Sequence, residues 1–152
     1  MQSYNFFFIY TIDAKIFFGE DFYKPKIVWA SVGAIEYSII PKEYFLLDTN
    51  YFFSIETSIE LLAILNSKLL YWWISKEDTP IGTGGAYRHY KYNLERIAIP
   101  YISEQIKNNL NELIKQILNE NKNIEQIQNE INNLVYKLYN LTEQEIIEIE
   151  RF

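Results

Sequence analysis

The hydrophobic pattern of the chain changes its period near residue 57, and this change restricts the possible folds more than any other feature. Before it, runs of about five β-branched and aromatic residues are separated by turn signals, which is typical of short strands in a twisted, mainly antiparallel sheet. After it, apolar residues recur at helical spacing. We therefore expect an α+β fold, with a sheet from residues 1–56 and 93–99 packed on a buried helix, then a C-terminal helical hairpin and a short last helix. The expected strands are YNFFFIYTI, KIFFG, KPKIVWASV, AIEYSII, EYFLLD, NYFFSI and YNLERIAIP.

The buried helix is expected within SIELLAILNSKLLYWWISK, which is apolar nearly all round. Thr57 and Glu60 have the spacing of a capping box, so the helix should begin near Ser58. It should end near Lys76. Three consecutive aromatic side chains cannot all share one helical face, so at least one should lie outside the core: Tyr71, Trp72 and Trp73.

The last third of the chain has a helical pattern of a different kind, and Ser103 is the expected N-cap of its first helix. Five apolar residues are spaced seven apart, which is heptad-like and leaves one unbroken helix open: Leu110, Ile117, Ile124, Ile131 and Leu138. We favour a break at 119–123, because the asparagines there are poor helix formers. Thr142 and Glu145 repeat the capping-box spacing before the last helix. We therefore divide the chain into residues 1–100 and a C-terminal helical segment, 101–152.

Composition indicates a cytoplasmic protein with no membrane partner. The length of 152 residues suits one compact domain, and the chain contains no cysteine, so neither disulfides nor a thiolate metal site is expected. Apolar runs such as 61–65 are far too short to span a bilayer, and the first residues lack the features of a signal peptide.

The net charge of −6 argues against an indiscriminate nucleic-acid binder, because phosphate contacts dominate such binding. The stretch TPIGTGGAYRHYKYNLERIAIP, residues 79–100, differs from the rest of the chain. It contains three basic residues, Arg88, Lys91 and Arg96, against the single acid Glu95. A locally positive stretch on an acidic chain indicates a bounded binding surface.

The glycines of this stretch do not form a known phosphate-binding motif. A P-loop requires Lys-Ser or Lys-Thr after its glycines, and a dinucleotide fingerprint requires a third glycine and a following helix. Neither pattern is present. His89, the one histidine, has no Ser, Asp or Glu at a diagnostic spacing, and no pair of carboxylates stands out. We therefore expect no catalysis by this chain.

Binding is the chemistry that the stretch can support. Arginine can contact guanine, lysine can neutralise phosphate, and tyrosine can stack or donate a hydroxyl. The alternative is a mobile loop whose tyrosines cover the edge of a sheet. From these residues alone, both interpretations stay open.

Five motifs in order resemble the TaqI-like C-terminal specificity domain of type II restriction–modification enzymes. The resemblance covers roughly residues 24–150. Its motifs are KPKIVW, YFLLDTNYFFS, LLAILNSKLLYWW, GTGGAYRHYKYNLERIAIP and INNLVYKLYNLTEQEIIEIE. Each is weak, but their order is fairly specific.

The resemblance implies sequence-specific recognition of double-stranded DNA for an adenine-N6 methyltransferase or a type II (IIG-like) restriction enzyme. The Asn-Pro-Pro-Tyr/Phe motif, the glycine-rich S-adenosylmethionine loop and a nuclease motif are absent from the sequence. We therefore expect a non-catalytic fragment or subunit without a cofactor, whose partners are the methyltransferase and nuclease domains of the parent enzyme. S-adenosylmethionine and Mg²⁺ would bind to those domains.

The expected DNA contacts lie mainly in the glycine stretch. Arg88 should read a base or phosphate, Lys26 and Lys91 should position the DNA backbone, and the tyrosines should support or stack. The full set is Lys26, Gly82, Thr83, Gly84, Gly85, Tyr87, Arg88, His89, Tyr90 and Lys91. The main alternative function is a protein–protein interaction module that acts through the heptad-like helices.

Overall fold

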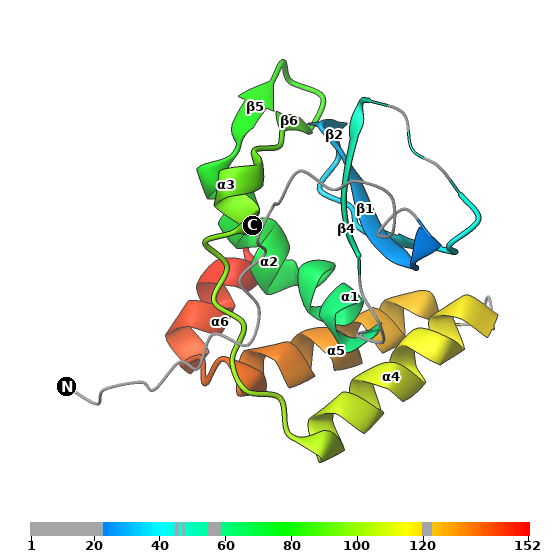
Figure 1. The fold of residues 1–152 in the computed structure, drawn as a ribbon. Helices are drawn as coiled ribbons and strands as arrows, with labels where there is room; N and C mark the ends of the chain where they lie inside the picture. The colour runs from blue at the N-terminus through cyan, green and yellow to red at the C-terminus, as the bar shows by residue number, and fades with distance from the viewer. Residues whose placement is uncertain (1–22, 45, 47, 55–58, 120–122) are drawn as a thin grey trace.

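The protein has an α+β fold, as the sequence predicts (Figure 1). The structure is a computed structural model that describes residues 23–44, 46, 48–54, 59–119 and 123–152. The expected strands YNFFFIYTI and KIFFG, and the expected helix start at Thr57 and Ser58, lie outside these residues. The elements are β1 (Lys26–Ala30), β2 (Val32–Gly33), β3 (Ser38–Ile40), β4 (Asn50–Ser54), α1 (Ile59–Leu65), α2 (Lys68–Glu77), β5 (Thr79–Ile81), β6 (Ala86–Arg88), α3 (Lys91–Leu94), α4 (Glu104–Asn119), α5 (Ile124–Leu138) and α6 (Glu143–Glu150).

The described strands form two small sheets instead of the single expected one. Sheet A has the order β3-β1-β4 and sheet B the order β2-β6-β5, and every strand pair is antiparallel. The chain passes directly from sheet A to sheet B, because only Ser31 separates the end of β1 from the start of β2. Sheet B contains both strands that flank the glycines of the 79–100 stretch.

Two expected strands are wrong. Residues 93–99 contain the end of α3, a turn and a segment without regular secondary structure, and none of them pairs with a described strand. The side chain of Asn93 donates to the carbonyl oxygen of Glu77 and to Asp78, which holds this segment against the end of α2. In the run EYFLLD, residues 45 and 47 lie outside the described ranges, and none of the other four is in a strand, with Glu43 and Asp48 in turns.

The expected buried helix is two helices, α1 and α2, broken at Asn66 and Ser67. Ser67 caps α2 by accepting a hydrogen bond from the Leu70 amide at 3.4 Å. Asn66 accepts a hydrogen bond from the Tyr37 amide at 3.0 Å and donates one to the Tyr37 carbonyl oxygen at 2.8 Å, so the residue before β3, far away in sequence, stabilises the break. The end of α2 at Glu77, beside Lys76, is confirmed.

The aromatic triplet of α2 divides between surface and core as expected. Tyr71 is 38% exposed, whereas Trp72 and Trp73 are half-buried and pack against the core cluster. The guanidinium of Arg96 lies 5.9 Å from the ring centroid of Trp73. The first aromatic of the triplet therefore lies outside the core.

The C-terminal helical hairpin is confirmed. Helix α4 ends at Asn119 and α5 begins at Ile124, after Asn123 in the left-handed conformation (φ 55°). Residues 120–122 of the expected break lie outside the described ranges. Ser103 caps α4 by accepting a hydrogen bond from the Ile106 amide at 3.4 Å. The capping box of α6, between Thr142 and Glu145, is also confirmed.

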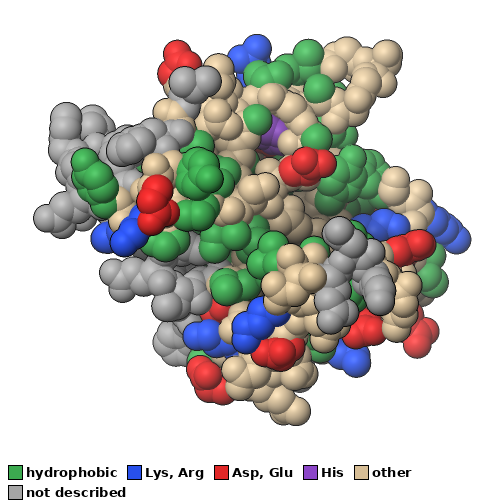
Figure 2. Space-filling view, turned by 90° about the vertical axis from the view of Figure 1, so that its right-hand side faces the viewer, with side chains coloured by type: hydrophobic (Ala, Val, Ile, Leu, Met, Phe, Trp, Pro, Cys, Tyr) green, Lys and Arg blue, Asp and Glu red, His purple; other side chains and the backbone are tan. Residues whose placement is uncertain are grey.

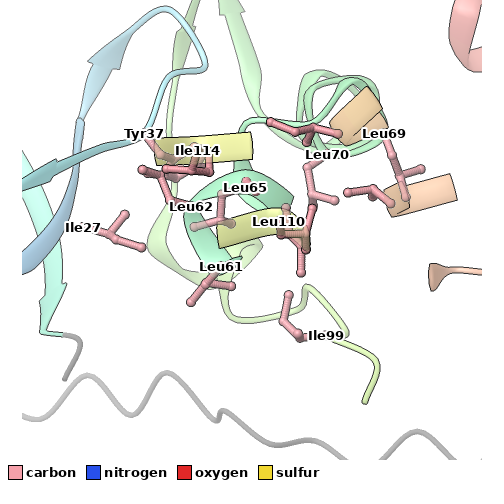
Figure 3. Packing of buried hydrophobic residues seen from close by; sticks show 14 of the residues in the cluster. Ile27, Tyr37, Leu61, Leu62, Leu65, Leu69, Leu70, Ile99, Leu110 and Ile114 are labelled. Carbon is pink, nitrogen blue, oxygen red and sulfur yellow. The ribbon is translucent and has the colours of Figure 1, made fainter. Parts of the chain in front are cut away.

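One apolar core joins sheet A, α1, α2 and the helical hairpin. Figure 3 shows Leu62 and Leu65 of α1 close to Leu110 and Ile114 of α4, with Ile27 of β1 on the other side. The core therefore crosses from residues 1–100 into 101–152. None of the helices in the described ranges combines the length and the hydropathy that a membrane crossing requires.

Candidate nucleic-acid interface

The glycine stretch forms a β-hairpin. Strands β5 and β6 pair antiparallel, with Thr79 opposite Arg88 and Ile81 opposite Ala86. Between them lies the hairpin tip, which we define as Gly82, Thr83, Gly84 and Gly85, all exposed. In Figure 1 the hairpin projects at the top of the molecule, away from α4 and α5. A partner can therefore reach the hairpin from outside.

One face of sheet B presents Arg88 to solvent. Residues directly opposite in an antiparallel ladder share a face, so Val32 and Thr79 flank Arg88, and Ile81 and Ala86 continue the same face. We call these five residues the Arg88 face. Arg88 is exposed, Val32 is 44% and Ile81 36% exposed.

The charge of Arg88 is free of internal ion pairs in the described part of the chain. Other basic side chains are engaged: Lys91 lies 2.9 Å from Glu95, and Arg96 lies 2.5 Å from Glu77. The guanidinium on the Arg88 face therefore remains available to an anion or a base edge.

A buried polar cluster holds the base of the hairpin. Nδ1 of His89 lies 2.6 Å from Oδ2 of Asp78, and its Nε2 lies 3.2 and 3.1 Å from the carbonyl oxygens of Gly33 and Ala34. Asn93 donates to Oδ1 of Asp78 at 2.8 Å. We call Asp78, His89 and Asn93 the hairpin lock, because the cluster joins β2, β6, α3 and the end of α2.

The hairpin lock is almost fully closed to solvent. The side chains of Asp78 and His89 are 2% and 4% exposed. All three partners of the His89 ring are oxygen acceptors, and the imidazolium is the form that donates from both nitrogens. Burial raises the pKa of the nearby Tyr37 hydroxyl, and the charge of Asp78 raises it further. The lock is thus a compact, buried, hydrogen-bonded unit at the base of the hairpin.

His89 does not lie where a DNA contact requires it. In Figure 2 the single histidine is visible only as a small purple area set back among its neighbours. Both of its ring nitrogens face groups of the same chain. The structure therefore gives His89 a hydrogen-bonding role in the interior and not an exposed position beside Arg88, because the chain folds β2 over it.

Lys26 also differs from its expected position. Its side chain is fully buried at the start of β1, and its ammonium donates to the carbonyl oxygens of Lys24 at 2.8 Å and Tyr44 at 3.4 Å. An ammonium held in this way is not accessible to a DNA phosphate. Lys26 also belongs to sheet A, whereas Arg88 belongs to sheet B.

The tyrosines of the stretch occupy different environments. Tyr87 is half-buried, with its ring centroid 6.5 Å from that of His89. Tyr90 and Tyr92 stack, with centroids 5.3 Å apart and an interplanar angle of 26°. Tyr92 is 56% exposed, which makes it a more accessible stacking surface than the expected Tyr87 and Tyr90.

Four members of the Arg88 face were missed at the sequence level: Val32, Thr79, Ile81 and Ala86. Val32 comes from a strand more than fifty positions before Arg88, and only the register of β2 on β6 brings the two together. Thr79 and Ile81 lie close in sequence, and the hairpin signal was available in two short runs flanking glycines. Recognising that hairpin would have placed them beside Arg88.

The site has no feature of a metal centre. In the residues that the structure describes, no group of three or more His, Cys, Asp or Glu side chains is arranged to hold a metal ion. The carboxylate oxygens of Asp78, the acidic residue of the site, are instead hydrogen-bonded to His89, Asn93 and the Tyr90 amide. The arrangement is suited to binding a partner through the exposed guanidinium of Arg88, the apolar side chains of Val32 and Ile81, and the glycine-rich hairpin tip.

Comparison with known proteins assigns no family. No protein-family model matches this chain, and no curated protein matches it. The function is therefore inferred from the residues and their geometry.

Proposed function

We propose that this chain recognises a specific sequence in double-stranded DNA on behalf of an adenine-N6 DNA methyltransferase or a type II restriction–modification enzyme. The observation that carries the proposal is Arg88, an exposed guanidinium with no internal ion pair in the described ranges, on one face of a projecting β-hairpin. The ordered motifs of the sequence support the same function.

The geometry of the hairpin suits the major groove. The groove is about 12 Å wide and admits a two-stranded β-ribbon, and an arginine can contact O6 and N7 of guanine there with two hydrogen bonds. Val32 and Ile81 beside Arg88 are exposed apolar groups that can contact a thymine methyl. The Arg88 face therefore combines hydrogen-bonding and apolar readout.

Side chains that follow β6 in the chain, at the start of α3, supply further contacts in this proposal. The exposed Tyr92, stacked on Tyr90, provides an aromatic surface, and the side chain of Lys91 is 43% exposed beside it. Lys91 forms an ion pair with Glu95, so its ammonium must leave Glu95, or contact Glu95 and a phosphate together, in order to bind DNA. Its role in this proposal is to position the DNA backbone.

The overall charge sets a limit on how the chain binds DNA. A chain of net charge −6 gains little from general phosphate attraction, since that attraction depends on the number of phosphates that Lys and Arg neutralise. Acidic and basic side chains are interspersed on the helical side of the molecule in Figure 2. We therefore assign most phosphate contacts to the methyltransferase and nuclease domains that act with this chain.

A function through the C-terminal helices has less support. The heptad-like residues Leu110 and Ile131 are at most 1% exposed and pack inside the chain's own core. They are therefore not free to form a coiled coil with another protein. The helices act here as the support on which sheet A and α1 rest.

The test is a binding selection by the purified full chain. Duplexes with a randomised centre are selected at low, stated salt, and the enriched sequences are read. We expect one enriched motif with the wild type and a relaxed motif with Arg88→Ala, because a bidentate arginine–guanine contact contributes about 1–3 kcal/mol of discrimination.

Lys137→Ala is the matched control. It removes one exposed cation that has no acidic partner in the described ranges, from α5 on the far side of the molecule. This variant should enrich the wild-type motif. A wild type that enriches nothing, or an Arg88→Ala variant with an unchanged motif, would refute DNA recognition through this face.

A further inference from the structure

The fold of the chain does not require a glycine at position 84. Gly82 and Gly85 have φ values of +65° and +74°, in the left-handed region where a side chain is strained. Gly84 has a negative φ, and a Cβ built on it meets no atom within 4 Å. Neither backbone conformation nor internal packing explains the absence of a side chain at this position.

The hairpin tip also offers unpaired backbone donors. Within the described part of the chain, no turn or loop hydrogen bond engages the amides of Thr83, Gly84 or Gly85. Backbone amides at a glycine-rich turn are common donors to phosphate oxygens, and a glycine lets the other surface approach the backbone closely. Thr83 is the one residue of the tip with a side chain.

The tip is held in place from below. The hairpin lock fixes His89, the residue after β6, to Asp78, the residue before β5, at 2.6 Å. The two ends of the hairpin are therefore joined through a buried contact, while the tip itself projects freely (Figure 1). An arrangement of this kind presents the tip amides at a constant position relative to Arg88.

We infer that the hairpin tip is a phosphate-contact point, at which the DNA backbone comes into van der Waals contact with the Cα of Gly84 and accepts hydrogen bonds from the tip amides. This inference rests on the proposed function. It assigns separate tasks to the two ends of β6: Arg88 discriminates between sequences, and the tip fixes the register of the hairpin on the duplex. Contacts to phosphate position a protein without reading sequence.

The experiment measures the affinity of the full chain for the duplex selected by the wild type and for a scrambled duplex of equal length. Gly84→Ala should weaken binding to both duplexes by a similar factor of about ten or more, as expected when a methyl group is forced into a packed contact. Its enriched motif should stay that of the wild type, and its thermal midpoint should be unchanged or slightly raised. Gly84→Val should weaken binding further, because the loss follows side-chain volume.

Lys137→Ala is the control, because it removes an exposed side chain of α5 and leaves the hairpin unchanged. It should retain wild-type affinity for both duplexes. Gly84→Ala with wild-type or tighter binding would overturn the tip contact and leave recognition by Arg88 standing, and so would a Lys137→Ala variant that loses as much as Gly84→Ala. A wild type that selects no motif would remove the proposed function and this inference together.

Discussion

At the scale of single residues, burial decides what each charged group in the 79–100 stretch does. Asp78 and His89 lie 2.6 Å apart with side chains at most 4% exposed, whereas Arg96 and Glu77 form an ion pair with side chains 58% and 30% exposed. Exposed pairs contribute little because water and salt screen them. Removing one partner of a buried pair leaves a desolvated charge without compensation.

Asp78→Ala should therefore lower the free energy of unfolding by about 3–5 kcal/mol, the usual cost of breaking a buried pair. Asp78→Asn should cost clearly less. An asparagine amide can donate to Nδ1 of a neutral His89 whose Nε2 still donates to the carbonyl oxygens of Gly33 and Ala34. Urea denaturation followed by circular dichroism measures both variants.

Glu77→Ala is the surface control for Asp78→Ala, and it should cost under about 1 kcal/mol. Equal losses for Glu77→Ala and Asp78→Ala would contradict the assignment of the hairpin lock as the dominant polar contact. A loss for Asp78→Asn as large as for Asp78→Ala would show that the ion pair itself, and not the hydrogen-bond pattern, is required.

The same scale shows which site residues can be predicted from sequence. Lys26, Arg88 and His89 all belong to residue types suited to DNA contact, yet two of them are buried. Their burial follows from strand pairing and from carbonyl oxygens far away in sequence, such as that of Tyr44 on Lys26. Residue type and local spacing carry no information on such distant partners.

At the scale of elements, boundaries encoded by adjacent residues could be predicted. The capping box at Thr142 and the N-cap at Ser103 depend on contacts within a few residues, and the end of α4 at Asn119 agrees with the low helix propensity of asparagine. The break between α1 and α2 could not be predicted in this way. It depends on Asn66 bonding to the backbone of Tyr37, 29 positions away.

Helix α6 is joined to α2 and α5 by a contact that depends on pH. Glu150 accepts a hydrogen bond from Lys68 of α2 at 2.7 Å and from the hydroxyl of Tyr136 of α5 at 2.6 Å. The Lys68 ammonium foremost, with the Tyr136 hydroxyl, holds the pKa of the Glu150 carboxyl below its usual range. The folded pKa of Glu150 is thus lower than its unfolded pKa, so its stabilisation is present above the unfolded pKa and is lost as pH falls through the folded pKa.

Glu150→Gln should therefore be less stable than the wild type at neutral pH, by under about 1 kcal/mol because the side chain is 46% exposed. The difference should disappear in acid, where the wild-type carboxyl is protonated and resembles the amide. Thermal midpoints of both proteins across a pH series measure this. Glu148→Gln, at an exposed position on the same helix, is the control and should match the wild type throughout. A Glu150→Gln deficit that persists in acid would contradict the ionic origin of the contact.

At the scale of the whole molecule, the C-terminal hairpin and the α+β part depend on one core. Leu110 of α4 is fully buried against α1, and Ile131 and Val135 of α5 are at most 1% exposed. The heptad-like spacing of the sequence is thus used for intramolecular packing. The helices hold the sheets from the side opposite the hairpin (Figure 1), which under the proposed function would present the hairpin to DNA at a defined angle.

This arrangement predicts that the full chain unfolds as one monomeric unit. Leu110→Ala should lower the free energy of unfolding by about 2–5 kcal/mol, the range for truncating a fully buried leucine. Leu118→Ala, on the same helix but at a position that is 62% exposed, should change it by at most about 0.5 kcal/mol. Urea unfolding followed at two wavelengths, one sensitive to helix and one to tryptophan, should give coincident transitions for the wild type, because both halves share the core.

Protein concentration separates this expectation from a function through coiled-coil pairing. If α4 and α5 bound a second copy, the folded state would be stabilised by mass action and the unfolding midpoint would rise with concentration. With Leu110, Ile131 and Val135 buried in the same chain, the midpoint should stay constant over a wide range of concentration, and sedimentation should give the monomer mass of 18.2 kDa. A midpoint that rises with concentration, together with a Leu118→Ala variant that abolishes the rise, would instead assign the exposed side of the hairpin to self-association and favour the interaction-module function over DNA recognition.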